Sequence, residues 1–487
     1  MPNNELRYAD AVQPEQAGAL SAMLWPLMLV LFITTLDQTI IATALARMGE
    51  DLHDSSNVSW VATAFLLTSA VSTLIFGKLG DMKGRKKVLQ VAIALFVLGS
   101  VLCALAPTLL WLIGFRAFQG IGAGGLSSLV MAVVGDLVPA RERARYQALL
   151  GVVPALAIIV GPLLGGLIVD QWSWPWIFLI NVPVGGLAFY WIAVRLQLPV
   201  RPIAHQLDVG GALLATLFTG SFLLLMVQGG HAFGWGSWPS LGLAAVSVIA
   251  LWTYMQVERS AAEPITPLRL FANDIFSVSA ALFFLSTATL FVGMLFVPLM
   301  LQTVFGLSAL GAGSSIIALL LGLIGATMLT GAVISRTGRY RVFPILGALL
   351  GGAGLYLLGQ LQVDTPLWLI VLFLVVLGIG LGFFIQVVVV AGQNAVAHRD
   401  LGVATGALNF FKTLGGATGA AISGAVLTSR MAHAATAEAR LAAFHSVFHG
   451  AIILMGLALV LAWLLREKPL SPEMVEVAEG RVDVPEY

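Results

Sequence analysis

Long apolar runs recur along the whole of this chain, and they restrict its fold more than any other feature. Each run has roughly 20 residues, enough to cross the hydrocarbon core of a bilayer as a helix. Only 10% of the 487 residues are charged and 59% are hydrophobic, whereas a soluble protein carries about 25% charged residues. The sequence therefore predicts an all-α polytopic membrane protein.

Fourteen such spans are predicted, because each connection between them contains charges, proline or glycine that would break a helix. They lie near residues 23–46, 57–77, 88–106, 109–135, 146–169, 174–196, 208–228, 239–257, 275–301, 309–334, 342–361, 366–391, 401–427 and 447–466.

The distribution of lysine and arginine gives the orientation. If the N-terminus is cytoplasmic, the loops on that side hold sixteen of these residues, and the opposite loops hold only Arg47, Arg430 and Arg440. Short loops rich in Lys and Arg face the cytoplasm. We therefore expect an even number of spans with both termini in the cytoplasm.

The most densely charged connection runs from Gly77 to Lys87, with five cations and one acid in eleven residues. Such a cluster cannot lie in hydrocarbon, and its glycines mark a tight turn. The same spacing of glycines and cations returns in weaker form at 331–341, where Ser335 stands in place of Asp81. This internal repeat indicates that the chain is built from two similar halves.

Five motifs resemble those of the major facilitator superfamily, and in particular its fourteen-helix drug:proton antiporters. They are the loop 77–87 and the segments 36–45, 116–124, 161–166 and 174–185. The resemblance implies a major facilitator fold with two six-helix bundles, at 23–200 and 263–466, and a substrate site between them. Two additional transmembrane helices would then occupy 201–262, and residues 1–22 and 467–487 would be cytoplasmic tails.

Asp37 is the one carboxylate predicted to lie well inside a span, where an acid costs about 2.5–3.5 kcal/mol to insert. At a rise of about 1.5 Å per residue, Arg116 lies at a similar depth in the fourth span. We expect Asp37 to carry the coupling proton and Arg116, which keeps its charge, to tune it. Two alternatives remain: Asp37 in a purely structural ion pair, and Arg116 as a tie between helices.

Further polar residues inside the spans are expected to support this pair: Gln38, Gln119, Gln386, Asn409 and Lys412. Lys412 lies too deep in its span to reach the membrane surface easily. The sequence leaves open whether it is a second fixed charge or a packing tie.

The resemblance also implies a cytoplasmic gate, in which Asp81 and Arg85 form an ion-pair network at the inner helix ends. Its other members would be Gly77, Gly84, Asp136 and Arg145. The alternative is that the charged loop acts only as a topology signal. The resemblance further implies a close helix packing that blocks leakage, at Gly161, Pro162, Gly165 and Gly166.

Aromatic and methionine side chains predict the substrate cavity, because such surfaces suit flat, lipophilic and often cationic compounds. The candidates are Phe291, Met294, Phe296, Phe384 and Phe411. No metal site or cofactor is predicted, since His445 and His449 lack an evident third ligand and Cys103 is the single cysteine.

These features predict a proton-coupled efflux transporter of lipophilic or cationic drugs in a bacterial inner membrane, working as a monomer by alternating access. The chain lacks a Gly-x-x-x-x-Gly-Lys-Ser/Thr loop, which favours an ion gradient over ATP. The main alternative is export of one metabolite, such as a siderophore, amino acid or lipid; an importing symporter and a membrane enzyme or sensor are others. A periplasmic adaptor is a candidate partner, and a net charge of +1 gives no reason to expect nucleic acid.

Overall fold

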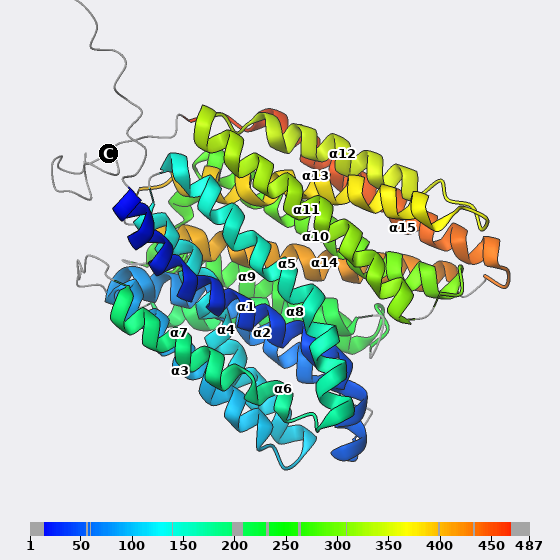
Figure 1. Ribbon diagram of the computed structural model, residues 1–487, viewed down its shortest axis with the longest axis horizontal. Helices are drawn as coiled ribbons and strands as arrows, with labels where there is room; N and C mark the ends of the chain where they lie inside the picture. Colours follow the sequence, from blue (N-terminus) through cyan, green and yellow to red (C-terminus); the bar gives the residue numbers. More distant parts are fainter. Residues whose placement is uncertain are drawn as a thin grey trace, which may run out of the picture.

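The computed structural model describes residues 14–54, 57–58, 60–138, 140–196, 208–229, 233–261, 264–307, 309–397, 400–431 and 434–468. Helices fill most of these ranges and run side by side in one elongated bundle (Figure 1). They are α1 (Pro14–Asp51), α2 (Trp60–Lys83), α3 (Arg85–Ala104), α4 (Leu109–Leu137), α5 (Ala140–Gln171), α6 (Trp176–Leu179), α7 (Asn181–Arg195), α8 (Val209–Gln228), α9 (Trp238–Ser260), the short η1 (Leu268–Leu270), α10 (Asp274–Thr303), α11 (Ala309–Thr337), α12 (Val342–Leu358), α13 (Leu367–Asn394), α14 (Leu401–Met431) and α15 (Ala437–Leu464).

Each expected span coincides with a helix, and the differences lie at the ends. The sixth is broken after Leu179 into the single turn α6 and the longer α7. The last helix begins at Ala437, well before residue 447, and Thr436 caps it by accepting a hydrogen bond from the Ala439 N–H. The prediction from hydropathy leaves out the first turns of this helix, because Glu438 and Arg440 are charged. A helix can nevertheless extend beyond the apolar core of the membrane.

Twelve of the described helices are long and apolar enough to cross a membrane. The prediction of fourteen spans is not supported by this measure. The 17-residue α12 is short, and α14 is diluted by Lys412 and by many glycine, alanine and threonine residues. A multi-pass membrane protein is nevertheless clear from the number of apolar helices.

The helices before and after α8 and α9 pack in matching pairs. In the first set α2 packs on α4, α3 on α4 and α1 on α5; in the second set α11 packs on α13, α12 on α13 and α10 on α14. Glycines allow the same close approach in each: a side chain at Gly124 would meet the backbone of Ser69, and one at Gly378 would meet that of Leu319. This correspondence agrees with the weak repeat of the charged loop.

Direct contacts between the two sets follow two seams, where α5 packs on α11 and where α14 packs on α2 and α4. The pair α8 and α9 lies at the second seam, because α8 packs on α2 of one set and on α14 of the other. The Phe218 ring of α8 lies 6.4 Å from the Phe410 ring of α14. A hydrogen bond of 2.9 Å from Ser247 to Ser221 joins α9 to α8.

Candidate functional site

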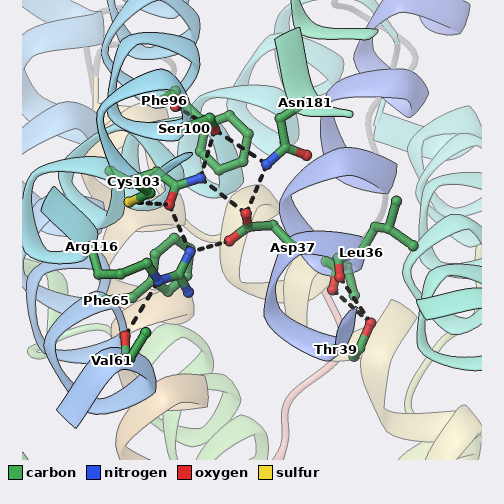
Figure 2. A network of polar contacts seen from close by, with 12 residues as sticks. Leu36, Asp37, Thr39, Val61, Phe65, Phe96, Ser100, Cys103, Arg116 and Asn181 are labelled. Atoms are coloured by element: carbon green, nitrogen blue, oxygen red, sulfur yellow. Dashed lines mark hydrogen bonds and ion pairs between the residues drawn. The ribbon is translucent and has the colours of Figure 1, made fainter. Parts of the chain in front are cut away.

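A buried polar network surrounds Asp37 in the middle of α1 (Figure 2). The carboxylate is 1% exposed and accepts three hydrogen bonds. Asp37 Oδ2 receives one from Arg116 Nη1 at 2.5 Å, and Oδ1 receives one from Gln119 Nε2 at 3.0 Å and one from Asn181 Nδ2 at 2.7 Å. The donors come from α4 and α7, so three helices meet at one acid.

Arg116 is as deeply buried as Asp37, at 1% exposed. Its guanidinium also donates to Gln119 Oε1 at 2.7 Å and to the Val61 backbone oxygen at 3.3 Å. The rings of Phe65 and Phe178 lie 4.1 and 5.6 Å from its central carbon. A buried charge is tolerated when it is paired and hydrogen-bonded, and this cation has both kinds of support. The structure therefore brings Asp37, Arg116 and Gln119 together as a unit.

Ser100 of α3 completes the network. Neither Ser100 nor Asn181 was predicted from the sequence to be part of this site. The Ser100 hydroxyl accepts hydrogen bonds from Gln119 at 2.7 Å and from Asn181 at 3.2 Å. Gly99 makes this approach feasible, since a side chain there would meet the backbone of Gln119. Asn181 belongs to the motif at 174–185. Its amide side chain inside an apolar run was the one sequence feature that could have marked it as a member of the network.

A cavity of about 740 Å³ lies between α2, α8, α10 and α14, with Gln38 of α1 at its wall. Its lining includes Phe291 and Phe296, which were predicted to line it, and also Gln38, Asn409 and Lys412, which were predicted to support the Asp37–Arg116 pair and are found at the cavity instead. Asp37 and Arg116 are not among the lining residues. The contribution of α8, through Leu223, Met226 and Val227, was not expected.

Three residues that were predicted to line this cavity do not line it, and the prediction for each is corrected; Gln386, which was predicted to support the Asp37–Arg116 pair, lies on α13 of the second set instead. Phe384 is fully buried on α13 and packs toward Gly347 of α12. Phe411 stacks against the Phe271 and Phe410 rings, at 5.9 Å from each. Gln386 is 1% exposed inside α13, and Met294 is half-buried on α10 away from the lining. All four lie on helices of the second set, and α13, which carries Phe384 and Gln386, contributes no residue to the lining.

Asp81 connects the two sets at the end of the bundle where α2 meets α3. Its carboxylate accepts hydrogen bonds from the first-turn N–H groups of α14, from Gly402 at 3.2 Å and from Val403 at 3.0 Å. Helix starts leave such N–H groups without partners and favour negative charge. Arg85 binds Asp81 at 3.0 Å and Asp136 at 2.8 Å. The three charges thus hold α2, α3, α4 and α14 together.

The remaining residues of the expected gate take different positions. Gly77 lies against the Gly402 backbone, which lets α2 and α14 cross closely. Gly84 has φ 88°, a conformation that favours glycine, and it separates α2 from α3. Arg145 is exposed and does not join the network. Gln147 of α5 adds a second link across the sets, donating to Gln393 of α13 at 2.8 Å.

Changing Asp81 to alanine should loosen the start of α14. Charge-assisted hydrogen bonds are each worth about 1.5–3 kcal/mol, and this change removes two of them. We expect the amide hydrogens of Gly402 and Val403 to exchange with solvent faster by at least roughly tenfold. Hydrogen exchange followed by mass spectrometry measures this, with Asp274→Ala as the control, because Asp274 forms an exposed ion pair elsewhere. Unchanged exchange at both amides would mean that Asp81 does not hold α14.

The glycines of the motif at 161–166 pack α5 against α1. A side chain at Gly161 would meet Thr39, and one at Gly165 would meet Thr43 and Ile40. Pro162 is exposed, and nothing lies within 4 Å of the Cβ position at Gly166. Two of the four expected packing residues therefore make the contact.

Comparison with known proteins gives a consistent family. A family model described as Major Facilitator Superfamily matches residues 27–420. An uncharacterized MFS-type transporter of Mycobacterium tuberculosis is 38% identical over 80% of this chain. The multidrug transporter protein MdtP of Bacillus subtilis is 34% identical over 83% of this chain and 74% of its own length. The chain spans 57% of the length of the Mycobacterium relative. Among solved structures, the proton:xylose symporter XylE aligns with a TM-score of 0.63 at 15% identity, over 95% of this chain and 99% of that one.

Proposed function

This chain belongs to the major facilitator superfamily, and from that membership we propose that it is a secondary active exporter that releases lipophilic small molecules in exchange for protons. Membership and the transporter relatives favour a transporter over an enzyme or a sensor. The outward direction is supported by similarity to proteins named as efflux pumps.

The observation that carries the proposal is the Asp37–Arg116 pair, buried behind the cavity wall and held by residues of four helices. All three groups that face the carboxylate donate N–H hydrogens. A protonated acid presents an O–H, which none of these N–H groups can accept; Asn181 would first have to turn its amide oxygen, which has no hydrogen-bond partner, toward Asp37. The closed network therefore belongs to the deprotonated acid, and protonation of Asp37 favours an arrangement in which its helix has separated from α4.

The helix α4 connects the Asp37 network to the other end of the bundle, so a movement of α4 relative to α1 also displaces residues there. Arg116 lies near the start of α4, and Asp136, which binds Arg85, lies near its end. Arg85 in turn binds Asp81, the residue that holds the start of α14. We propose that loading and unloading of the proton at Asp37 alternates with opening and closing of this gate. Gly161 and Gly165 keep α5 with α1 as a unit during the movement.

We propose that α12 and α14 also cross the membrane, which gives fourteen transmembrane helices. The length of α12 corresponds to about 25 Å, close to a bilayer core that thins locally. The polar residues of α14, such as Asn409 and Lys412, line the cavity, where they do not meet lipid. In this arrangement 23–200 and 263–466 are the two bundles, 201–262 holds the extra helices, and both termini lie in the bacterial cytoplasm.

The proposal is tested with the full chain in proteoliposomes under an imposed pH gradient. A transported compound should speed the collapse of that gradient, because each molecule exchanges for protons. Liposomes without protein report the passive leak of the same compound. If no member of a panel of lipophilic acids, bases and neutral compounds changes the proton flux, the exchange mechanism is wrong.

A further inference from the structure

Lys412 extends into the cavity from the middle of α14, and its side chain is exposed there. Its nearest aromatic neighbour is Phe283, whose ring centroid lies 5.9 Å from Lys412 Nζ. Within the described part of the chain, the ammonium has neither an ion pair nor a hydrogen bond. An ammonium that deep in a membrane protein is costly unless something compensates its charge.

The other described lining residues offer no compensation. They are apolar side chains or neutral hydroxyl and amide groups, so Lys412 is the sole charged side chain among the described residues of the lining. Asp37 is 1% exposed and is not among the lining residues, and its charge is matched by Arg116. The cavity therefore carries a net positive charge whenever Lys412 is protonated.

The remaining walls fit an amphipathic molecule. Phe291 and Phe296 of α10 and Met226 of α8 provide an apolar surface, which suits a flat hydrocarbon body. Asn409 lies one turn before Lys412, and Gln38 faces the cavity from α1. The ammonium makes a strong charge-assisted hydrogen bond with a carboxylate or sulfonate, and a neutral amide N–H can donate to the same acid group more weakly.

We propose that the preferred substrate is an amphipathic organic anion, bound with its acid group at Lys412 and its apolar body against α8 and α10. The inference rests on the proposed export function and assigns the charge of its substrate. It replaces the expectation of cationic drugs, since a cation would meet the like charge of Lys412. It also has an electrical consequence: exchange of one internal anion for one external proton moves two positive charges inward. A negative interior therefore accelerates export.

The test uses two probes that share a pyrene ring and differ in charge, 1-pyrenebutyrate and a pyrenebutyl-trimethylammonium salt. We expect proteoliposomes to transport the anion at least about tenfold faster than the cation under the same proton gradient. Lys412→Met, which keeps the length and removes the charge, should lower anion transport by about tenfold and leave the cation unchanged or faster. Lys412→Arg should restore anion transport, and Arg430→Met, at the exposed end of the same helix, should change neither probe.

Three results would overturn the assignment: faster transport of the cation, equal loss of both probes in Lys412→Met, or equal rates with and without the charge at position 412. In each of these cases the wild type still shows proton-driven transport, so the exporter proposal stands. A binding measurement tests the site when the exchange mechanism itself fails. Binding of both probes is measured with the protein in nanodiscs, and the signal from empty nanodiscs is subtracted. Anion binding that depends on Lys412 without proton-coupled transport would support the site and reject the exchange mechanism. Absence of such binding together with absence of transport would reject the site.

Discussion

Replacing Asp37 with asparagine should abolish proton-driven transport while the protein stays folded and still binds substrate. Asparagine has nearly the same shape, but it cannot take up and release a proton. Its amide also presents an N–H toward one of the donors, either Arg116 or the pair Gln119 and Asn181. We therefore expect transport driven by a pH gradient to fall to the level of protein-free liposomes.

The measurement compares Asp37→Asn with the wild type in proteoliposomes, for gradient-driven uptake and for substrate binding. Asp274→Asn is the matched control, because Asp274 is an exposed acid on α10 whose ion pair with Arg466 lies outside the network. It should transport like the wild type. If Asp37→Asn also transports like the wild type, another group carries the proton and Asp37 is part of a structural ion pair.

Replacing Arg116 with methionine should be the most destabilising single change in the first set of helices. It leaves the Asp37 carboxylate buried without its cation, and breaking a buried pair in this way costs about 3–5 kcal/mol. Methionine preserves much of the contact with Phe65 and Phe178, so the loss reports on charge more than on packing. Thermal and SDS-induced unfolding of the purified protein measures it.

A second substitution separates the charge effect from the packing effect. In Arg116→Met with Asp37→Asn, no unpaired charge remains, and we expect most of the lost stability to return. Transport should be absent from both variants. The double variant lacks the acid that carries the proton, and Arg116→Met lacks the cation that pairs with it. If Arg116→Met transports normally, Arg116 serves only to tie α4 to its neighbours, and the exchange mechanism loses its fixed charge.

The positions of the helices could be read from the sequence because each needs about 20 apolar residues and ends at charges, proline or glycine. The common depth of Asp37 and Arg116 followed from the rise per residue, and the structure joins them at 2.5 Å. The sequence could not place Ser100 and Asn181 beside them. Depth is set by counting along one helix, whereas contact also depends on how each helix is rotated about its axis.

The same rotation explains the errors at the cavity. Phe291 and Phe384 are equally plausible by residue type, yet the first is 37% exposed at the wall and the second is fully buried against α12. Whether an extra helix lies far from the substrate or beside it is a tertiary property, so the role of α8 in the lining had no sequence signal. The preference for cations came from the aromatic and methionine side chains, which carry no information on the charged residues beside them in this particular cavity.

The position of α8 has a consequence for the route by which molecules reach the cavity. Helices of the two sets meet directly along both seams, but along the second seam α8 also packs on α2 and α14 and provides part of the wall. Compounds dissolved in the surrounding leaflet are therefore screened off from the α2–α14 side. A bulky lipid-soluble molecule must therefore reach the cavity by a path that avoids α8, so this helix selects the cargo by path as well as by chemistry.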